Sequence, residues 1–260
     1  MSDIEKLPVQ LKQLGLRTCA QIFEEEANKA AKVGLSYTAF LSKLVDEEIA
    51  AKVDRSINAR IAKAHFPMIR SLEEFDFTFQ PSLSAARIRE LGELGFLGRA
   101  ENIILVGRPG VGKTHLAISL GLRACQDRKR VLFISAIDLL DDLLAAEVSR
   151  QLGKSIEIFG RLNLLIIDEL GYTPMDGHRA NLLFQLVSYL YTRVSMVVTT
   201  NLSFDHWGTM FGGDEVIASA ILDRLLHHSH VFLIAGPSYR MKDKVTQTLA
   251  ETGVSGQDMP

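Results

Sequence analysis

The chain of 260 residues has little cysteine and no long apolar run. Its two cysteines, Cys19 and Cys125, stand far apart and show no metal-type spacing, which argues against a disulfide scaffold and a thiolate metal site. No apolar run approaches the roughly 18 residues that a membrane-spanning helix needs. The first residues also lack the cationic and apolar regions of a signal peptide. We therefore predict a cytoplasmic protein that does not interact with a membrane.

An excess of positive charge is also lacking, since the formal net charge is −2 at pH 7. This balance excludes a globally basic protein, so any contact with nucleic acid must come from a local patch. The length, with 47% of residues hydrophobic, suffices for one well-cored domain and a smaller module. We place a helical domain at residues 1–70, a core domain at residues 71–245, and a disordered tail of small and polar residues at residues 246–260.

A glycine-rich segment follows the short apolar run Ile103–Val106 and precedes a helix-forming segment. The residues from Gly107 to Thr114 form the pattern G-x-x-x-x-G-K-T, which is typical of a phosphate-binding loop. Its glycines let backbone N–H groups point at an anion, and the following helix adds the positive end of its dipole. Lys113 would reach the terminal phosphates, and the Thr114 hydroxyl would ligate Mg²⁺. The pattern predicts binding of a nucleoside triphosphate; the alternative is a glycine-rich turn without a ligand.

Strands and helices alternate after this loop. Apolar, β-branched runs at residues 131–135, 164–167, 196–200 and 231–235 are separated by helix-length segments. Together with the run before the loop, they predict a parallel sheet of five strands covered by helices on both faces. Ligands of such sheets bind at the carboxyl ends of the strands, where the polar residues described next stand.

Two acidic residues, Asp168 and Glu169, end the strand that begins at residue 164. Asp168 follows four apolar strand residues, which is typical of a carboxylate that holds Mg²⁺ indirectly, through a water molecule or through the groups that ligate the ion. Glu169 would reach the γ-phosphate as the base or water-positioning group that hydrolysis needs. The additional strand between the loop and Asp168 favours the ATPases that use such a glutamate over small-molecule kinases and GTPases. The alternative interpretation is that both residues are strand-end caps.

Three further residues are candidates for contact with the γ-phosphate. Asn201 closes a strand, and its amide would orient the attacking water, although Asn at such a place is often only a turn former. Arg224, near the end of a helix, would complete a neighbouring subunit's site as an arginine finger. Alternatively it pairs with Asp223 or is a surface charge. Arg240, just after the last strand, would contact the γ-phosphate within its own subunit.

The N-terminal part, residues 8–65, is predicted to be helical with a break at residues 34–36. On a helical projection its later part has a basic face opposite an apolar one, with the basic side chains of Lys52, Arg55, Arg60 and Lys63. This face predicts contact with the phosphates of DNA, and the alternative is an ordinary solvated face. The following segment carries Phe75, Phe77 and Phe79, which we expect to pack as a strap on the core domain; stacking on bases is the alternative.

The ordered motifs resemble those of the IstB-like ATP-binding proteins of bacterial insertion sequences, which are AAA+ ATPases related to bacterial helicase loaders. The motifs that carry this resemblance are G-R-P-G-V-G-K-T-H, L-L-I-I-D-E, V-V-T-T-N, F-x-x-W, A-I-L-D-R-L-L-H-H and S-Y-R. The resemblance covers residues 75–244 and implies an α/β P-loop NTPase core of the AAA+ type beside a small all-helical N-terminal domain. Arg108 stands where the family commonly has proline, at a position whose side chain faces out.

The resemblance also implies roles for individual residues. ATP would be bound by Gly107, Arg108, Pro109, Gly110, Val111, Gly112, Lys113, Thr114 and His115. Thr114 and Asp168 would hold Mg²⁺, and Lys113, Glu169, Asn201, Arg224 and Arg240 would be catalytic. The implied activity is that of a transposition helper, which assembles on target duplex DNA with ATP, recruits or stimulates the partner transposase, and disassembles on hydrolysis.

Too few residues follow the last predicted strand to form the helical lid that usually covers an AAA+ nucleotide site. We therefore expect a neighbouring subunit to close over the nucleotide, so that ATP drives homo-oligomerisation and adjacent subunits share an active site. Two other hypotheses stay open. The first is a helicase loader, whose main partner is a protein and whose DNA is single-stranded. The second is a switch that binds ATP and hydrolyses it negligibly, against which Glu169 argues.

Overall fold

The computed structural model describes residues 3–239, and the chain divides into two compact units between Ala59 and Arg60. The first unit is helical, and the second combines helices with a parallel sheet. The tail predicted at residues 246–260 lies outside the described residues, and so does Arg240.

The described part of the first unit consists of helices α1 (Asp3–Gln13), α2 (Arg17–Val33) and the greater part of α3 (Tyr37–Lys63). The predicted break at residues 34–36 is confirmed, because Gly34 ends α2 with a left-handed φ of 66°. A second break, between α1 and α2, was not predicted. It contains Gly15, which has a φ of 73°.

A buried carboxylate connects α2 and α3 within the first unit. Glu48 of α3 is 2% exposed, and its Oε2 accepts hydrogen bonds from the backbone N–H groups of Thr18 (2.7 Å) and Cys19 (2.9 Å). These N–H groups lie in the first turn of α2, where the helix supplies no partner and where a negative charge is favourable. Arg55 donates to the other oxygen of Glu48 at 2.8 Å. The contact between the two helices therefore depends on a neutralised carboxylate as well as on apolar packing.

The second unit contains the predicted sheet of five parallel strands. They are β1 (Asn102–Gly107), β2 (Val131–Ser135), β3 (Leu164–Leu170), β4 (Ser195–Thr200) and β5 (Ser229–Ile234). Their order across the sheet is β2-β3-β4-β1-β5, and each neighbouring pair is parallel. The carboxyl ends of all five strands therefore meet at the same edge.

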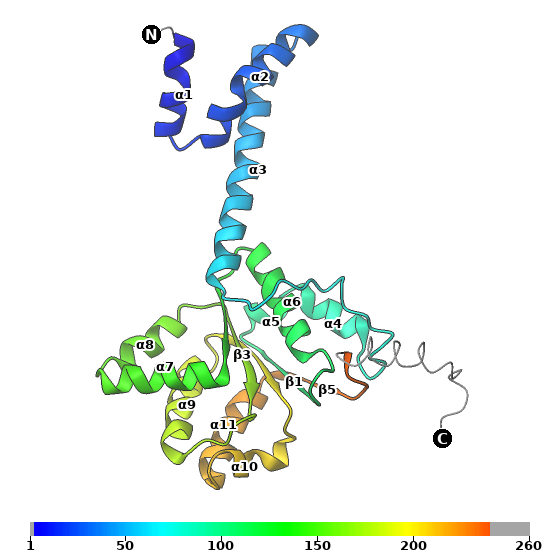
Figure 1. The fold of residues 1–260 in the computed structure, drawn as a ribbon, viewed down its shortest axis with the longest axis vertical. Coiled ribbons are helices and arrows are strands. Elements are labelled where there is room, and N and C mark those ends of the chain that lie inside the picture. Colours follow the sequence, from blue (N-terminus) through cyan, green and yellow to red (C-terminus); the bar gives the residue numbers. More distant parts are fainter. Residues whose placement is uncertain (1–2, 240–260) are drawn as a thin grey trace, which may run out of the picture. The chain divides into compact units, whose positions relative to one another are not determined.

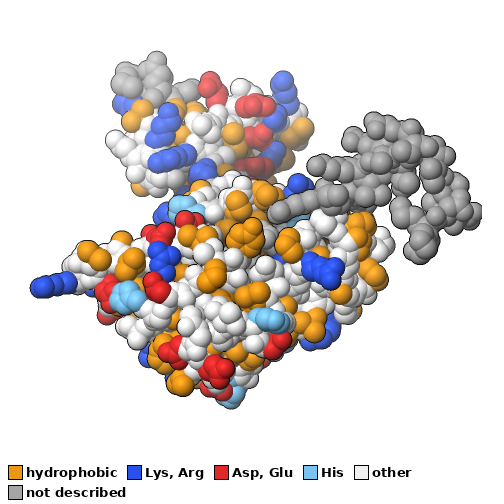
Figure 2. Space-filling model, turned by 60° about the horizontal axis from the view of Figure 1, so that its bottom comes forward, with side chains coloured by type: hydrophobic (Ala, Val, Ile, Leu, Met, Phe, Trp, Pro, Cys, Tyr) orange, Lys and Arg blue, Asp and Glu red, His pale blue; other side chains and the backbone are white. Residues whose placement is uncertain are grey.

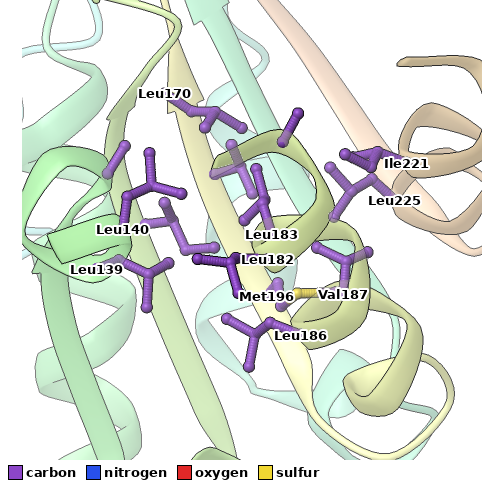
Figure 3. Close-up of a cluster of buried hydrophobic side chains, with 14 of the residues drawn as sticks. Leu139, Leu140, Leu170, Leu182, Leu183, Leu186, Val187, Met196, Ile221 and Leu225 are labelled. Atoms are coloured by element: carbon purple, nitrogen blue, oxygen red, sulfur yellow. The ribbon is translucent and has the colours of Figure 1, made fainter. Parts of the chain in front are cut away.

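Helices cover both faces of this sheet (Figure 1). One face packs against α4 (Ala85–Gly92) and α6 (Lys113–Gln126), with the short α5 (Gly95–Gly98) beside α4. The other face packs against α7 (Ala136–Val148), α9 (Gly177–Leu190) and α11 (Glu215–Leu226), and α8 (Leu152–Phe159) packs on α7 and α9. Figure 3 shows leucines of α9 between those of α7 on one side and Ile221 and Leu225 of α11 on the other, over this second face. Burial on both faces explains why the strands are continuous apolar runs.

Four short elements were not predicted: α5, α8, η1 (Phe204–His206) and α10 (Trp207–Met210). Trp207 is fully buried among residues that include Phe204 and Phe211, and it holds η1 and α10 against the core. Burial of this large side chain fixes these short segments where helix propensity alone would not.

The division between the units lies earlier than the predicted boundary near residue 71, because the end of α3 packs on the core of the second unit. Ala64 is fully buried there, and its carbonyl accepts a 2.8 Å hydrogen bond from the N–H of Phe133 in β2. The ring of Phe66 lies 6.3 Å from that of Phe133 in an edge-on contact. By their contacts, residues 60–70 group with the second unit, whereas the predicted helical domain extended to residue 70.

Across residues 3–239, none of the helices is both long and apolar enough to cross a membrane. Figure 2 shows that on the face drawn there, acidic, basic and apolar side chains of the described residues are interspersed. A protein of this kind needs local rather than global charge to attract a polyanion.

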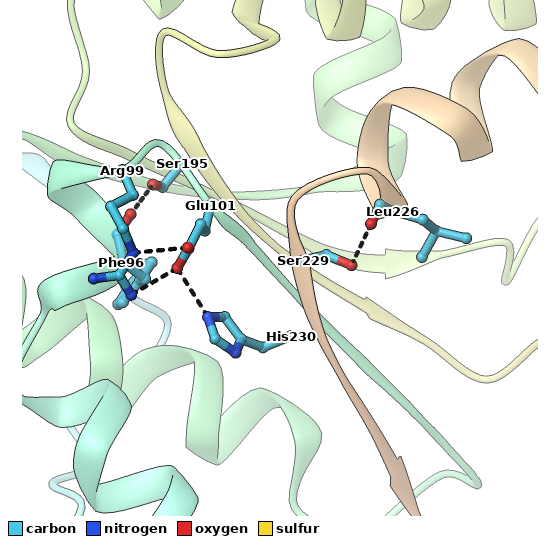
Figure 4. Close-up of polar contacts among 7 residues, drawn as sticks. All are labelled: Phe96, Arg99, Glu101, Ser195, Leu226, Ser229 and His230. Atoms are coloured by element: carbon cyan, nitrogen blue, oxygen red, sulfur yellow. Dashed lines mark hydrogen bonds and ion pairs between the residues drawn. The ribbon is translucent and has the colours of Figure 1, made fainter.

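A polar cluster joins the amino ends of β1 and β5, at the opposite edge of the sheet from the phosphate loop (Figure 4). Arg99 donates two hydrogen bonds to the Glu101 carboxylate, at 2.7 and 2.9 Å, and Nε2 of His230 lies 3.0 Å from Glu101 Oε2. The bonds from Arg99, followed by the contact with His230, lower the pKa of Glu101 from its ordinary value of 4.5 to about 2.

This cluster predicts acid-sensitive stability in the second unit. Because the folded-state pKa of Glu101 is lowered, its contribution is fully present above about pH 4.5 and is lost as the pH falls towards 2. The contribution changes by at most about 1.4 kcal/mol per pH unit. Urea unfolding of the wild type and of Glu101→Gln over this range should give free energies of unfolding that converge as the pH falls. A difference independent of pH would contradict the assignment.

Candidate functional site

The loop between β1 and α6 has the shape that its sequence predicts. Gly110 and Gly112 have φ angles of 84° and 100°, in the left-handed region that glycine adopts readily. A Cβ at Gly112 would lie 2.7 Å from the ring of Phe75, so this position also requires glycine for space. α6 begins at Lys113 and directs its unpaired N–H groups at the loop. The arrangement suits a phosphate group.

Lys113, Thr114 and Asp168 lie together at the start of α6 and the end of β3. The Lys113 ammonium donates to the carbonyls of Gly107 (2.7 Å) and Arg108 (3.0 Å) and is almost fully buried. The Thr114 hydroxyl lies 3.0 and 3.2 Å from the two carboxylate oxygens of Asp168, which is 8% exposed. The structure thus brings the predicted phosphate-binding lysine and both predicted metal-binding residues into one site.

Glu169 occupies an unusual backbone conformation beside Asp168. Its φ is 60°, in the left-handed region, and its side chain is exposed. The register between β3 and β4 shifts here: Ile167 pairs with Val198, and the next pair is Leu170 with Thr200. Such a β-bulge re-aims side chains and is common next to functional sites.

These residues open into a cavity of about 650 Å³. Its lining includes the predicted residues Pro109, Gly110, Gly112, Lys113, Thr114, His115, Glu169 and Asn201. It also includes Met68, Arg70, Glu74, Phe75, Tyr172 and Tyr239, which were not predicted as site residues. The volume lies within the range usual for small-molecule sites.

Two members of the predicted loop, Arg108 and Val111, are not among the described residues that line the cavity. The side chain of Arg108 is exposed and is not among the described residues lining the cavity, in agreement with an outward-facing position. Val111 is 1% exposed and packs in the core beneath the loop. His115 contacts the carbonyl of Ser71 through Nε2 at 2.9 Å, so it ties the loop helix to the preceding strap.

The strap of aromatic residues packs on the second unit, as predicted. Phe75 is 5% exposed, and its ring lies 4.8 Å from that of Phe77 and 5.2 Å from that of His115. The segment after β5 also reaches the loop, because the N–H of Tyr239 donates to the Gly110 carbonyl at 2.8 Å. The Tyr239 ring lies 4.5 Å from that of Phe79. The position of Tyr239 beside the predicted Arg240 could have indicated from the sequence that it lies at the site. No sequence feature indicated this for Met68, Arg70 or Tyr172.

Arg224 lies on α11 and is not among the described residues that line the cavity of its own chain. Its guanidinium donates to the carbonyl of Ala220 at 2.8 Å and lies 4.8 Å from the centre of the Phe184 ring. These contacts hold the side chain on the helix surface. They do not include the alternative pairing with Asp223.

The predicted basic face of α3 is distributed over both units. Lys52 and Arg55 belong to the first unit, and Arg60 and Lys63 belong to the second. Arg55 donates to Glu48 and, at 3.0 Å, to the hydroxyl of Thr18, so it has a structural role within its unit. Lys52 and Lys63 are exposed, whereas Arg60 is partly buried.

The residues present fit a nucleoside triphosphate and Mg²⁺. The Thr114 hydroxyl can donate its proton to Asp168 and keep its lone pairs for a cation. Hydroxyl and carboxylate oxygens are the ligands that Mg²⁺ prefers. The curled loop, the start of α6 and the ammonium of Lys113 supply the donors that phosphates require.

Solved structures with a similar fold include proteins of DNA replication. The DnaC helicase loader aligns with a TM-score of 0.50 and 23% identity, over 58% of this chain and 88% of that chain. AMPPCP-bound DnaA from Aquifex aeolicus aligns with a TM-score of 0.55 and 18% identity, over 75% of this chain and 58% of that chain. At these identities the likeness establishes the fold, which is that of an AAA+ P-loop NTPase.

Sequence comparison gives a closer relationship. Residues 9–247 match the family described as IstB-like ATP binding protein. The chain is 42% identical over 241 residues to the ATP-binding protein of insertion sequence IS21 from Pseudomonas aeruginosa, covering 93% of this chain and 91% of the relative. It is also 42% identical over 235 residues to that of insertion sequence IS5376 from Geobacillus stearothermophilus, covering 90% and 93%. The chain therefore belongs to the family of IstB-like ATP-binding proteins of insertion sequences.

Proposed function

We propose that this protein is a Mg²⁺-dependent ATPase that assembles on target duplex DNA and recruits or stimulates a transposase encoded by the same insertion sequence. The observation that carries the ATPase part is that Lys113, Thr114 and Glu169 line one cavity and that Thr114 is hydrogen-bonded to Asp168. The proposed link to transposition is supported by relatives that are ATP-binding proteins of insertion sequences.

Each residue has a chemical task in this proposal. Lys113 and the loop N–H groups bind the phosphates, and Thr114 and Asp168 hold Mg²⁺, which supplies charge neutralisation when it is bound. Glu169 accepts the proton of the attacking water, and the Asn201 amide orients that water. Arg224 reaches the site of an adjacent subunit, and Arg240 acts within its own. The active site is then shared between subunits, and ATP binding drives their association.

Exposed lysines of α3, Lys52 and Lys63, are proposed to contact DNA phosphates. We expect ATP-dependent binding to random-sequence duplex DNA that weakens with salt, each phosphate contact adding about 0.9 to the logarithmic slope. Lys52→Ala should weaken binding for all sequences alike and reduce the slope by about 1. Fluorescence anisotropy with ATP, ADP and no nucleotide provides the measurement. Lys154→Ala, which changes an exposed lysine of α8, is the matched control and should leave the slope unchanged.

A helicase loader is the second candidate, and the observation that favours it is the similarity in fold to DnaC. Binding restricted to single-stranded DNA, or binding to duplex that is the same with every nucleotide, would support this candidate and contradict the ATP-dependent duplex assembly.

A further inference from the structure

Thr199 of β4 makes two hydrogen bonds to the acidic residues at the end of β3. Its hydroxyl oxygen lies 2.6 Å from Oδ1 of Asp168 and accepts the backbone N–H of Glu169 at 2.9 Å. The hydroxyl therefore donates to one acidic residue and accepts from the next. Thr199 itself is fully buried and does not line the cavity described above.

We propose that Thr199 is a positioning residue for ATP hydrolysis, which sets the direction of both Asp168 and Glu169 without touching the substrate. This inference rests on the proposed ATPase function. It concerns a residue that sequence analysis included in a strand and in the motif V-V-T-T-N without giving it a role.

The bulge explains why this position needs a hydroxyl. Between the pairs Ile167–Val198 and Leu170–Thr200, β3 has two residues, Asp168 and Glu169, and β4 has only Thr199. An extra residue leaves the regular ladder of backbone hydrogen bonds locally disrupted. The Thr199 side chain supplies the acceptor that the Glu169 N–H needs, in place of a backbone carbonyl. Without this acceptor the partly buried N–H of Glu169 would lose its hydrogen bond, which is unfavourable.

The bulge also brings both carboxylates to the same site. In a regular strand, consecutive side chains point to opposite faces of the sheet. Here Asp168 contacts Thr114, and Glu169 lines the cavity that contains Thr114. Glu169 has a left-handed φ of 60° in this arrangement, which is unfavourable for a residue with a side chain. The hydrogen bond to Thr199 helps to hold Glu169 in that conformation.

The second hydrogen bond acts on the metal-binding carboxylate. Oδ1 of Asp168 accepts hydrogen bonds from the hydroxyls of Thr199 (2.6 Å) and Thr114 (3.0 Å). These two hydroxyls define the orientation of the carboxylate. Partners of this kind, one step removed from a metal, fix the orientation of the residues that hold it. Thr199 thus links the orientation of the proposed metal-binding group to that of the proposed base.

The test replaces Thr199 with valine, which keeps the β-branched shape and removes the hydroxyl. We expect a decrease of about 10- to 100-fold in kcat for ATP hydrolysis, with the KM for ATP changed by less than about threefold. Thr199→Ser, which keeps the hydroxyl, should recover most of the lost kcat. Hydrogen exchange of the segment around Glu169 provides a readout besides activity, and this exchange should be faster in Thr199→Val and near the wild-type rate in Thr199→Ser.

Ser195→Ala is the matched control, because Ser195 is a buried hydroxyl residue at the other end of the same strand. It donates to the carbonyl of Phe96 at 3.3 Å (Figure 4). Its loss should lower the melting temperature without lowering kcat. A double variant supplies a further check: if Thr199 acts through Glu169, Thr199→Val should lower kcat much less in a Glu169→Gln background than in the wild type.

The outcomes separate this inference from the proposed function. A wild-type protein that binds ATP but does not hydrolyse it would contradict the ATPase proposal. The hydrogen-exchange measurement would still test whether Thr199 keeps Glu169 in its conformation. Unchanged kcat and unchanged exchange in Thr199→Val would overturn the inference. So would a kcat in Thr199→Ser as low as that in Thr199→Val, because the side chain would then act through its shape and not through its hydroxyl.

Discussion

Replacing Arg224 with alanine is expected to lower the rate of ATP hydrolysis by about 10³- to 10⁵-fold, the usual contribution of an arginine supplied by a neighbouring subunit. ATP affinity should change little, because Arg224 is not among the described residues that line its own chain's cavity. Phosphate release measures the first quantity, and titration with a fluorescent ATP analogue measures the second.

Arg193 provides a matched control for the structural contacts of Arg224. Its guanidinium lies 4.6 Å from the centre of the Tyr189 ring, as that of Arg224 lies 4.8 Å from Phe184. It also donates to a backbone carbonyl four residues earlier, as Arg224 does. Arg193→Ala therefore removes similar contacts and should leave hydrolysis unchanged.

Mixing variants tests whether the arginine acts between subunits. Lys113→Ala removes the phosphate-binding ammonium, and Arg224→Ala removes the arginine, so each protein alone should be inactive. A mixture can place an intact Lys113 opposite an intact Arg224 and should regain hydrolysis. If Arg224→Ala lost ATP binding together with hydrolysis, Arg224 would have a folding role instead.

The second large effect is expected for Glu169→Gln, which keeps the shape of the side chain and removes the base. Hydrolysis should decrease by about 10²- to 10⁴-fold, the range for a positioned general base. ATP binding and ATP-dependent assembly on DNA should remain, so the complex with DNA should persist longer than that of the wild type. The lifetime of this complex after dilution and the rate of phosphate release provide the two measurements.

Glu157→Gln is the control for this prediction, since Glu157 is an exposed residue of α8 outside the cavity lining. Turnover unaffected by Glu169→Gln would mean that Glu169 is not the catalytic carboxylate. The protein would then be better described as a nucleotide switch.

Much of the fold was predictable because it follows from periodicity. Strands buried on both faces must be continuous apolar runs, and β1 and β3 show this pattern clearly. The boundary between the units was harder to predict from the sequence, because α3 is continuous through Ala59. Only the contacts that its residues make assign them to one unit or the other. The short α8 and α10 depend on burial of side chains such as Trp207, which a local pattern does not reveal.

The candidate site was predictable where a sequence motif implies a particular backbone geometry, as it does from Gly107 to Thr114. It was not predictable where the role of a side chain depends on its contacts with residues of another strand. Thr199 stands in the motif V-V-T-T-N, but the sequence does not assign a role to its hydroxyl, because a β-branched residue suits β4 whether or not that hydroxyl is used. Arg55 shows the converse case: helical spacing placed it on a basic face, but the fold pairs it with the buried Glu48.

The hydrogen bond from Tyr239 to Gly110 has a thermodynamic consequence. This hydrogen bond joins the phosphate loop to the chain beyond β5, and Ser238 occupies the space where a side chain at Gly110 would lie. Any ligand that displaces the Gly110 carbonyl must also change the free energy with which Tyr239 docks. Linkage is reciprocal, so a partner that pulls on the segment at Tyr239 changes the loop's affinity for that ligand by the same factor.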